Sequence, residues 1–237
     1  MSIPKGTNPK RILGTHLIRL RKGEEIHALP HNDYLFQAVK LKGELYSLPE
    51  LVESFPAIFP DNTLPMVIEI GCYMGDTVVE LARYNRNLNV LGVDIKYKRV
   101  VKSCHKIRVE KLTNAKIALC DARQLLNLIP PNSLKGVCAF FPDPWLKGNQ
   151  RKHRFLDEHF FREMYNILMQ TGFIWLKTDN KIYYNYILKN IANLNFSMAP
   201  RPDGYLVDDT HTTFFERLFI DQEQPIYELF LVKKQDS

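Results

Sequence analysis

Strand-like and helical patterns alternate along this chain from Pro65 onward, and this alternation constrains the fold more than any other feature. Successive β–α–β units bring strands together in the same direction, with helices covering the faces of the sheet. The sequence therefore predicts an α/β protein with a mostly parallel, doubly wound sheet. We expect strands at 66–70, 89–94, 115–120, 136–141, 173–177 and 226–232, and helices at 78–84, 97–112, near Leu125, 159–169 and 183–194.

The composition fits one folded domain. The chain has 237 residues, of which 45% are hydrophobic, and this is enough for a substantial core. We expect residues 24–237 to form a single domain. No apolar run is long enough to cross a bilayer, and the N-terminus lacks the apolar segment of a signal peptide. We therefore expect a cytoplasmic protein without membrane contact. The four cysteines lie far apart without a Cys-x-x-Cys pair, so we expect reduced thiols.

The N-terminal segment is basic. Residues 1–23 contain six Lys or Arg and no acidic side chain, with prolines and glycines that disfavour regular structure. We interpret this segment as a flexible arm that contacts a nucleic acid, and an ordinary solvated terminus is the alternative. The formal charge of +6 and the pI near 9.0 favour a polyanionic partner without establishing one.

A glycine-bearing turn follows the first predicted strand. Gly71 and Gly75 bracket this turn at the start of a helix, and the second strand ends in Asp94 about 20 residues later. The arrangement is typical of a nucleotide site, where glycines let the backbone approach a ligand and the acid accepts hydrogen bonds from ribose hydroxyls. Tyr73 stands where a pyrophosphate-binding turn has its middle glycine. A cofactor with an adenosine but without phosphates therefore fits better.

Three further acids lie in or after predicted strands. Asp121 follows the third strand and Asp143 follows the fourth, and capping a helix is the commoner role for an isolated Asp there. In register with Asp94, they favour a ligand-binding sheet edge over separate caps. Glu69 lies inside the first apolar strand, where a carboxylate is costly unless it binds a cationic ligand group or the N-terminal arm.

The segment Phe140-Phe141-Pro142-Asp143-Pro144-Trp145 follows the fourth strand and leads into Lys147 and Arg151-Lys152-His153-Arg154. It places a carboxylate, an indole and several cations at one strand end. A turn with a capping Asp and a solvated charge cluster is the alternative. Trp145 either stacks on a base or braces the loop, and bracing is the commoner role for tryptophan.

These motifs together resemble the tRNA (guanine-N7-)-methyltransferases, which use S-adenosylmethionine. The resemblance covers most of the chain, from about Met66 to Val232. It is carried by Ile68-Glu69-Ile70-Gly71 with Met74-Gly75, Gly92-Val93-Asp94, Phe141-Pro142-Asp143-Pro144-Trp145-x-Lys147, Thr178-Asp179 and Thr213-Phe214-Phe215-Glu216-Arg217. Two departures are Tyr73 in the glycine turn, and residues 148–150 (Gly-Asn-Gln), where the family has a denser basic and histidine-rich stretch.

The resemblance implies a Rossmann-like sheet of seven strands with an antiparallel last strand. It implies methyl transfer from S-adenosylmethionine to N7 of a tRNA guanosine, in the variable loop. The residues that it places around the cofactor are Glu69, Gly71, Asp94, Asp121 and Asp143. The residues that it places against the guanosine or its tRNA are Lys147, Asp179, Thr213, Phe214, Phe215 and Glu216. The basic residues expected to bind RNA phosphates are Arg151, Lys152 and Arg154.

Asp143 is the catalytic candidate. Guanine N7 keeps an in-plane lone pair and the sulfonium is an activated methyl donor, so the reaction requires neither a strong base nor a metal. The methylated ring is positively charged, so a carboxylate at Asp143 or Asp179 would stabilise the charge that develops. Either acid also offers acceptors for guanine N1–H and N2–H₂. The seven histidines show no metal-ligand spacing.

Two other functions compete with this interpretation. A nicotinamide-dependent oxidoreductase shares the glycine turn and Asp94, but Tyr73 and the absence of an obvious Tyr-x-x-x-Lys disfavour it. A non-catalytic RNA-binding protein agrees with the charge but not with the acidic strand edge. The sequence leaves open the oligomeric state, the choice of tRNA and the need for a partner subunit.

Overall fold

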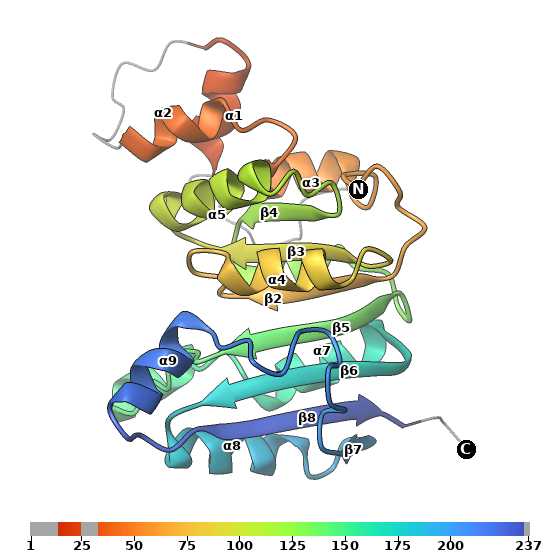
Figure 1. Cartoon of the computed structure of the whole chain (residues 1–237), viewed down its shortest axis with the longest axis vertical. Helices are drawn as coiled ribbons and strands as arrows, with labels where there is room; N and C mark the ends of the chain where they lie inside the picture. The colour runs from red at the N-terminus through yellow and green to blue at the C-terminus, as the bar shows by residue number, and fades with distance from the viewer. Residues whose placement is uncertain (1–13, 25–32, 235–237) are drawn as a thin grey trace. The chain divides into compact units, whose positions relative to one another are not determined.

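A computed structural model of the chain describes residues 14–24 and 33–234 (Figure 1). The chain divides into two compact units, which we call unit 1 (Met1–Leu128) and unit 2 (Ile129–Ser237). Strands and helices alternate as expected in the described ranges, which contain eight strands. That residues 24–237 behave as one domain remains a proposal, for which a single cooperative unfolding transition is the test.

Unit 1 is built around parallel strands in the order β1-β4-β3-β2. The strands are β1 (Leu45–Ser47), β2 (Met66–Ile70), β3 (Asn89–Asp94) and β4 (Ala115–Leu119). The helices are α1 (Thr15–Arg21), α2 (Asp33–Val39), α3 (Leu48–Ser54), α4 (Asp76–Tyr84), α5 (Tyr97–Val109) and α6 (Ala122–Leu126). α4 packs on β3 and α5 packs on β4 (Figure 1). Every residue of β3 is buried.

The register of unit 1 aligns the carboxyl ends of its strands. Ile70 pairs with Val93, and Asp94 pairs with Leu119. The last residues of β2, β3 and β4 therefore lie at one edge, where parallel sheets bind ligands. β1 adds a short strand beside β4, which the expected seven-stranded sheet lacks.

The N-terminal segment differs from the predicted flexible arm. Residues 1–13 lie outside the described ranges, but α1 is a regular helix whose Leu17 is fully buried. The Arg21 guanidinium donates to two backbone carbonyls and forms a 2.7 Å ion pair with Glu50. Residues 14–23 therefore pack as part of unit 1, because these contacts outweigh the glycines that suggested disorder.

Replacing Leu17 by Ala is expected to lower the free energy of unfolding by about 2–5 kcal/mol, the usual cost of truncating a buried leucine. Urea unfolding followed by circular dichroism measures the change. Lys22→Ala, an exposed position directly after α1, is the control and should unfold like the wild type. A flexible arm would instead give both variants wild-type stability.

Unit 2 contains strands in the order β5-β6-β8-β7. The strands are β5 (Leu134–Phe140), β6 (Leu168–Thr178), β7 (Phe196–Met198) and β8 (Tyr227–Lys233). The helices are the 3₁₀-helix η2 (Gly148–His153), α7 (Glu158–Ile167), α8 (Lys181–Ile191) and α9 (Phe214–Asp221). β5 and β6 are parallel, whereas β8 runs antiparallel to β6 (Figure 1). The expected antiparallel last strand is confirmed.

Two composition-based expectations can be compared with the structure. All four cysteines are buried and free, as expected for reduced core thiols. In the part of the chain that the structure describes, no helix combines the length and the apolar character needed to cross a membrane.

Candidate active site

The residues predicted to form the site divide between the two units. Glu69, Gly71, Asp94 and Asp121 belong to unit 1, whereas Asp143 and the predicted guanosine and RNA contacts belong to unit 2. Within each unit, the strand register brings residues of the group to one edge of the parallel strands.

The turn between β2 and α4 exposes backbone at the edge of unit 1. Gly71 and Gly75 both have a left-handed φ of 74°, and Tyr73 shares this conformation with a φ of 50°. The Gly71 amide donates to the Val93 carbonyl at 2.8 Å, which ties the turn to the end of β3. A Cβ at Gly75 would lie 2.6 Å from Ser103, whereas a Cβ at Gly71 would meet nothing within 4 Å. Gly75 is thus a packing glycine, and Gly71 is the glycine that a ligand can approach.

Asp94 is buried at the end of β3, and its carboxylate is held in place. Its side chain is 2% exposed. Oδ1 accepts from the Lys96 amide at 2.9 Å, and Oδ2 lies 3.3 Å from Nη1 of Arg99. The Arg99 guanidinium also lies 4.9 Å from the centroid of the Tyr73 ring. The long contact with Arg99 leaves Oδ2 with capacity to accept from a ribose hydroxyl.

Glu69 reaches from β2 to the first turn of α4. Its carboxylate accepts hydrogen bonds from the Thr77 hydroxyl and the Val78 amide, and Oε2 has no partner among the described residues. Burial, together with the nearby Asp76 carboxylate, raises the pKa of Glu69 to about 8. The carboxyl is therefore neutral at pH 7 unless a cation lies beside it, because a cation favours the ionised form.

Asp121 acts as a helix cap. It is exposed two residues after the end of β4, and its Oδ1 accepts from the Arg123 amide at 2.9 Å at the start of α6. Asp121 therefore has the helix-capping role that is the alternative to ligand binding for an acid at a strand end. Its contact with a cofactor stays a prediction.

These residues fit a cofactor that carries an adenosine and a positive charge but no phosphates. Glu69 offers a buried carboxylate oxygen without a partner, and Asp94 offers an acceptor for a ribose diol. Tyr73 fills the place where a pyrophosphate would need a glycine. S-adenosylmethionine has these features. Within residues 14–24 and 33–234, no three His, Cys, Asp or Glu side chains are arranged to hold a metal ion.

In unit 2, the loop that carries Asp143 follows β5 at the edge where β6 also ends. Phe140 pairs with Lys177, and the Phe141 amide donates to the Lys177 carbonyl at 2.8 Å. Asp179 comes directly after β6 and lies at the same edge. Asp143 is exposed, and its carboxylate has no hydrogen bond or ion pair with a described residue. The charge of Asp143 is therefore available to a ligand.

Arg154 is buried and holds this loop. It is only 6% exposed, its Nε donates to the Pro144 carbonyl at 2.9 Å, and its guanidinium lies 4.5 Å from a tyrosine ring of α8. The last residue of the basic run thus turns inward where η2 ends, and the RNA contact of Arg154 stays a prediction. Arg151, Lys152 and Lys147 are exposed, and their RNA contacts stay predictions.

Lys177 and Glu216 form a buried ion pair. Nζ lies 2.6 Å from Oε1, and the two side chains are 10% and 11% exposed. Oε2 of Glu216 accepts from the Thr213 amide at 3.2 Å, and the Glu216 amide donates to Oγ1 of Thr213 at 3.1 Å. Both oxygens of Glu216 are thus engaged in a capping box and an ion pair at the start of α9. Guanosine contacts at this end of α9 remain predictions. Glu216 holds the start of α9 through Thr213 and Lys177.

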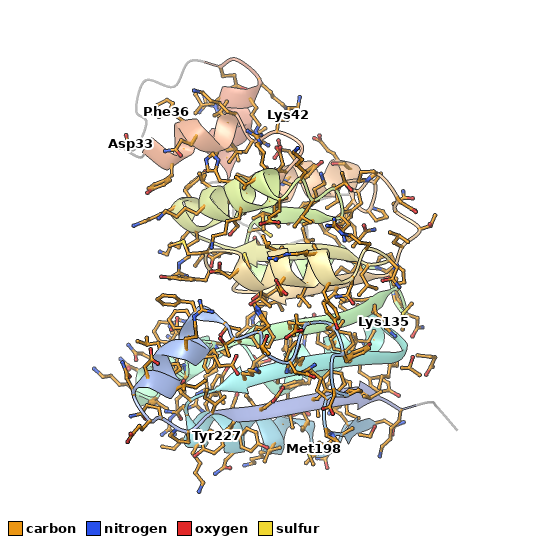
Figure 2. All side chains as sticks on the ribbon, viewed as in Figure 1. Asp33, Phe36, Lys42, Lys135, Met198 and Tyr227 are labelled. Atoms are coloured by element: carbon orange, nitrogen blue, oxygen red, sulfur yellow. The ribbon has the colours of Figure 1, made fainter. Side chains whose placement is uncertain are left out.

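Aromatic contacts join the Asp143 loop to α9. The rings of Phe141 and Phe219 lie 5.2 Å apart. Tyr227, labelled in Figure 2, begins β8 and pairs with Thr178, so the chain that leaves α9 returns to the end of β6. Three segments predicted to contact the guanosine therefore come together within unit 2: the Asp143 loop, the end of β6 and the start of α9.

The sequence of this chain is similar to those of known methyltransferases. The family model described as "Putative methyltransferase" matches residues 63–229. The chain is 30% identical over 200 residues to the tRNA (guanine-N(7)-)-methyltransferase of Rubrobacter xylanophilus, covering 84% of this chain and 88% of that protein. It is 33% identical over 182 residues to the protein of the same name from Histophilus somni, covering 73% of this chain and 70% of that protein.

A solved structure agrees at the level of the fold. The crystal structure of an aminoglycoside resistance methyltransferase aligns with a TM-score of 0.53 at 17% identity, covering 79% of this chain and 93% of that chain. At this identity the likeness concerns the fold alone. The predicted Rossmann-like α/β class is confirmed.

Proposed function

This chain belongs to the tRNA (guanine-N7-)-methyltransferase family, and we propose that it transfers the methyl group of S-adenosylmethionine to N7 of a guanosine in tRNA. The observation that carries the proposal is the strand edge of unit 1, where the buried acids Glu69 and Asp94 flank an open glycine turn. We place the reaction in the cytoplasm and the target guanosine in the variable loop, as the family resemblance implies.

The chain has to align its two substrates more than activate them. Guanine N7 accepts a methyl group without prior deprotonation, because its lone pair lies in the ring plane at neutral pH. Bound S-adenosylmethionine supplies a methyl group that the sulfonium already activates. Alignment of the reacting atoms, and stabilisation of the positive charge that develops on the guanine, then supply most of the rate enhancement.

We assign cofactor binding to the strand edge of unit 1. Asp94 accepts hydrogen bonds from the ribose hydroxyls, and Oε2 of Glu69 lies toward the cationic part of the ligand. The backbone of Gly71 lies against the ligand, because the space in front of it is open. Asp121 has a secondary role, since it already caps α6.

We assign guanosine recognition to the strand edge of unit 2. The exposed carboxylate of Asp143, which the resemblance also places near the cofactor, stabilises the charge on the ring. Asp179 and residues 213–215 contact the base or its ribose, and Lys147 with residues 151–152 contacts phosphates. Glu216 keeps the start of α9 in position through Thr213 and Lys177.

Asp94→Ala is expected to weaken S-adenosylmethionine binding by about 1.5–3 kcal/mol, the range for a hydrogen bond to a charged group. Isothermal titration calorimetry measures the affinity. Asp61→Ala, an exposed loop acid of the same unit, is the control and should bind like the wild type. Unchanged affinity in a folded Asp94→Ala protein would exclude Asp94 from the cofactor site.

Methylation of bulk unmodified tRNA with tritiated S-adenosylmethionine, followed by mapping of the modified base, tests the proposed function. The expected product is 7-methylguanosine, and any other product or none would contradict the proposal. Calorimetric titration of S-adenosylmethionine and of NAD separates the methyltransferase from a nicotinamide-dependent oxidoreductase. Binding of tRNA without binding of either cofactor would identify a non-catalytic RNA-binding protein.

A further inference from the structure

The net positive charge of the chain lies entirely in unit 1. Residues 1–128 contain 19 Lys or Arg and 13 Asp or Glu, whereas residues 129–237 contain 13 of each. The excess is concentrated further, because residues 95–123 hold nine Lys or Arg and two acidic residues. The basic run at 147–154 therefore lies in a unit without net charge, and the larger concentration of cations surrounds α5.

α5 has one buried face and one basic face. Its buried residues are Val100, Val101, Ser103, Cys104 and Ile107. The helix Tyr97–Val109 contains no Asp or Glu. Because residues three and four apart lie on the same side of a helix, Lys98, Lys102 and His105 form one exposed row.

Only part of this charge is neutralised within unit 1. Three cations of the helix have acidic partners among the described residues: Arg99 with Asp94, Lys106 with Asp76, and Arg108 with Glu44. Lys98 and Lys102 are exposed, and neither makes an ion pair or hydrogen bond with a described side chain. These two lysines are therefore available to an external anion.

The spacing of the lysines in α5 is unfavourable for the helix itself. Lys98 and Lys102 are four residues apart, as are Lys102 and Lys106, and like charges at this spacing destabilise a helix. Lys98 also lies in the first turn, where the helix dipole disfavours a cation and where no acidic residue is present. A bound polyanion would relieve both effects.

We propose that the exposed face of α5, centred on Lys98 and Lys102, binds the phosphate backbone of tRNA. This inference rests on the proposed function and adds a contact surface for the same substrate. The first turn of α5 lies at the edge to which we assign the cofactor, because Arg99 contacts Asp94 at 3.3 Å. An RNA strand along α5 thus starts at that edge, and its phosphates bind whatever the base sequence.

RNA fits this surface better than a membrane does. A helix that binds a bilayer inserts its apolar face, but the apolar face of α5 is buried in unit 1. Residues 98–105 contain no Phe, Tyr or Trp side chain on which a base can stack. A lysine ammonium group is a point charge on a flexible stem, and this suits contacts with backbone phosphates.

The double variant Lys98→Gln/Lys102→Gln tests this surface in the full chain. Fluorescence anisotropy with unmodified tRNA at several KCl concentrations gives the affinity and its salt dependence. We expect the log–log slope of affinity against salt to fall by about 0.7 to 0.9 for each phosphate that the variant no longer binds. The KM for tRNA should rise several-fold, while the single-turnover rate at saturating tRNA and the cofactor affinity stay at wild-type values.

Lys181→Gln/Lys189→Gln is the matched control, because it removes two exposed lysines from α8 of unit 2. Equal slopes of affinity against salt for the two double variants would overturn the proposal. The proposed function would not be affected, because the methylation assay tests it separately. An α5 variant that bound tRNA normally and lost only its binding to phosphatidylserine vesicles would overturn it as well. If the wild type bound tRNA through α5 but methylated none, the surface would stand and the proposed function would fail.

Discussion

Asp143→Asn is expected to lower the single-turnover rate of methyl transfer by about 10²- to 10³-fold, comparable to removing one preorganised electrostatic contact. The substitution keeps the size of the side chain and removes its charge. The carboxylate has no partner among the described residues, so removing its charge breaks no ion pair within the described part of the protein. Binding of cofactor and tRNA should change less than the rate, since the charge on the guanine develops during the reaction.

The loop that carries Asp143 is held on both sides. The Phe141 amide donates to the Lys177 carbonyl at 2.8 Å, and Nε of Arg154 donates to the Pro144 carbonyl at 2.9 Å. The two prolines restrict the backbone directly before and after the carboxylate. A carboxylate on a backbone held in this way acts on the transition state with little rearrangement of the loop, which is why a large effect is expected.

Asp203→Asn is the matched control, because Asp203 is an exposed acid that also follows a proline in unit 2. This variant should methylate tRNA at the wild-type rate. A rate for Asp143→Asn within a few-fold of wild type, measured at saturating cofactor and tRNA, would contradict the assignment. Asp179→Asn would then be the variant to measure, since Asp179 lies at the same strand edge.

The strands and the acidic edge were predictable because their signals are local. A strand buried on both faces reads as an apolar run, and β3 coincides with the predicted segment 89–94. α3 and α9 were not predicted, although each begins at a capping box, Ser47-x-x-Glu50 and Thr213-x-x-Glu216. The sequence predicts a substrate contact at the second motif, and the structure shows that the same residues begin α9.

The buried cations were not predictable from one sequence. Arg21 and Lys177 are long charged residues, for which exposure is the usual state. Each is buried because it meets an acid far along the chain: Glu50 lies 29 residues from Arg21, and Glu216 lies 39 residues from Lys177. Such a partner is identified only once the fold brings the two segments together. The packing of residues 14–23 through Arg21 is unpredictable from the sequence for this reason.

Lys177→Met is expected to lower kcat by about 10²-fold, the effect of misplacing reacting groups by roughly 1 Å. The KM for S-adenosylmethionine should not change. Lys177 joins the three segments assigned to the guanosine: its carbonyl accepts from Phe141 before the Asp143 loop, its Nζ binds Glu216 at α9, and Asp179 follows on the same chain segment. Removing the ammonium group releases α9 from β6.

The buried pair of Lys177 and Glu216 positions α9 against β6 more than it stabilises the fold. Desolvation of two charges offsets most of their attraction, and apolar replacements of such pairs are often neutral for stability. Lys177→Met alone leaves the Glu216 charge unpaired and destabilises the fold, so a second variant is needed. Lys177→Met/Glu216→Gln removes both charges and keeps a side chain that a capping box accepts. This double variant should fold like the wild type and still turn over slowly.

Lys233→Met supplies the matched structural control. Lys233 is 4% exposed, and its Nζ donates to Oδ1 of Asn132 at 2.9 Å and to the Leu168 carbonyl at 2.8 Å. It lies at the opposite end of β8 from Tyr227, so its replacement should lower stability and leave kcat unchanged. Lys177→Arg restores a cation and should recover part of the rate. A folded Lys177→Met/Glu216→Gln protein that turned over as fast as Lys233→Met would show that the three segments keep their positions without Lys177.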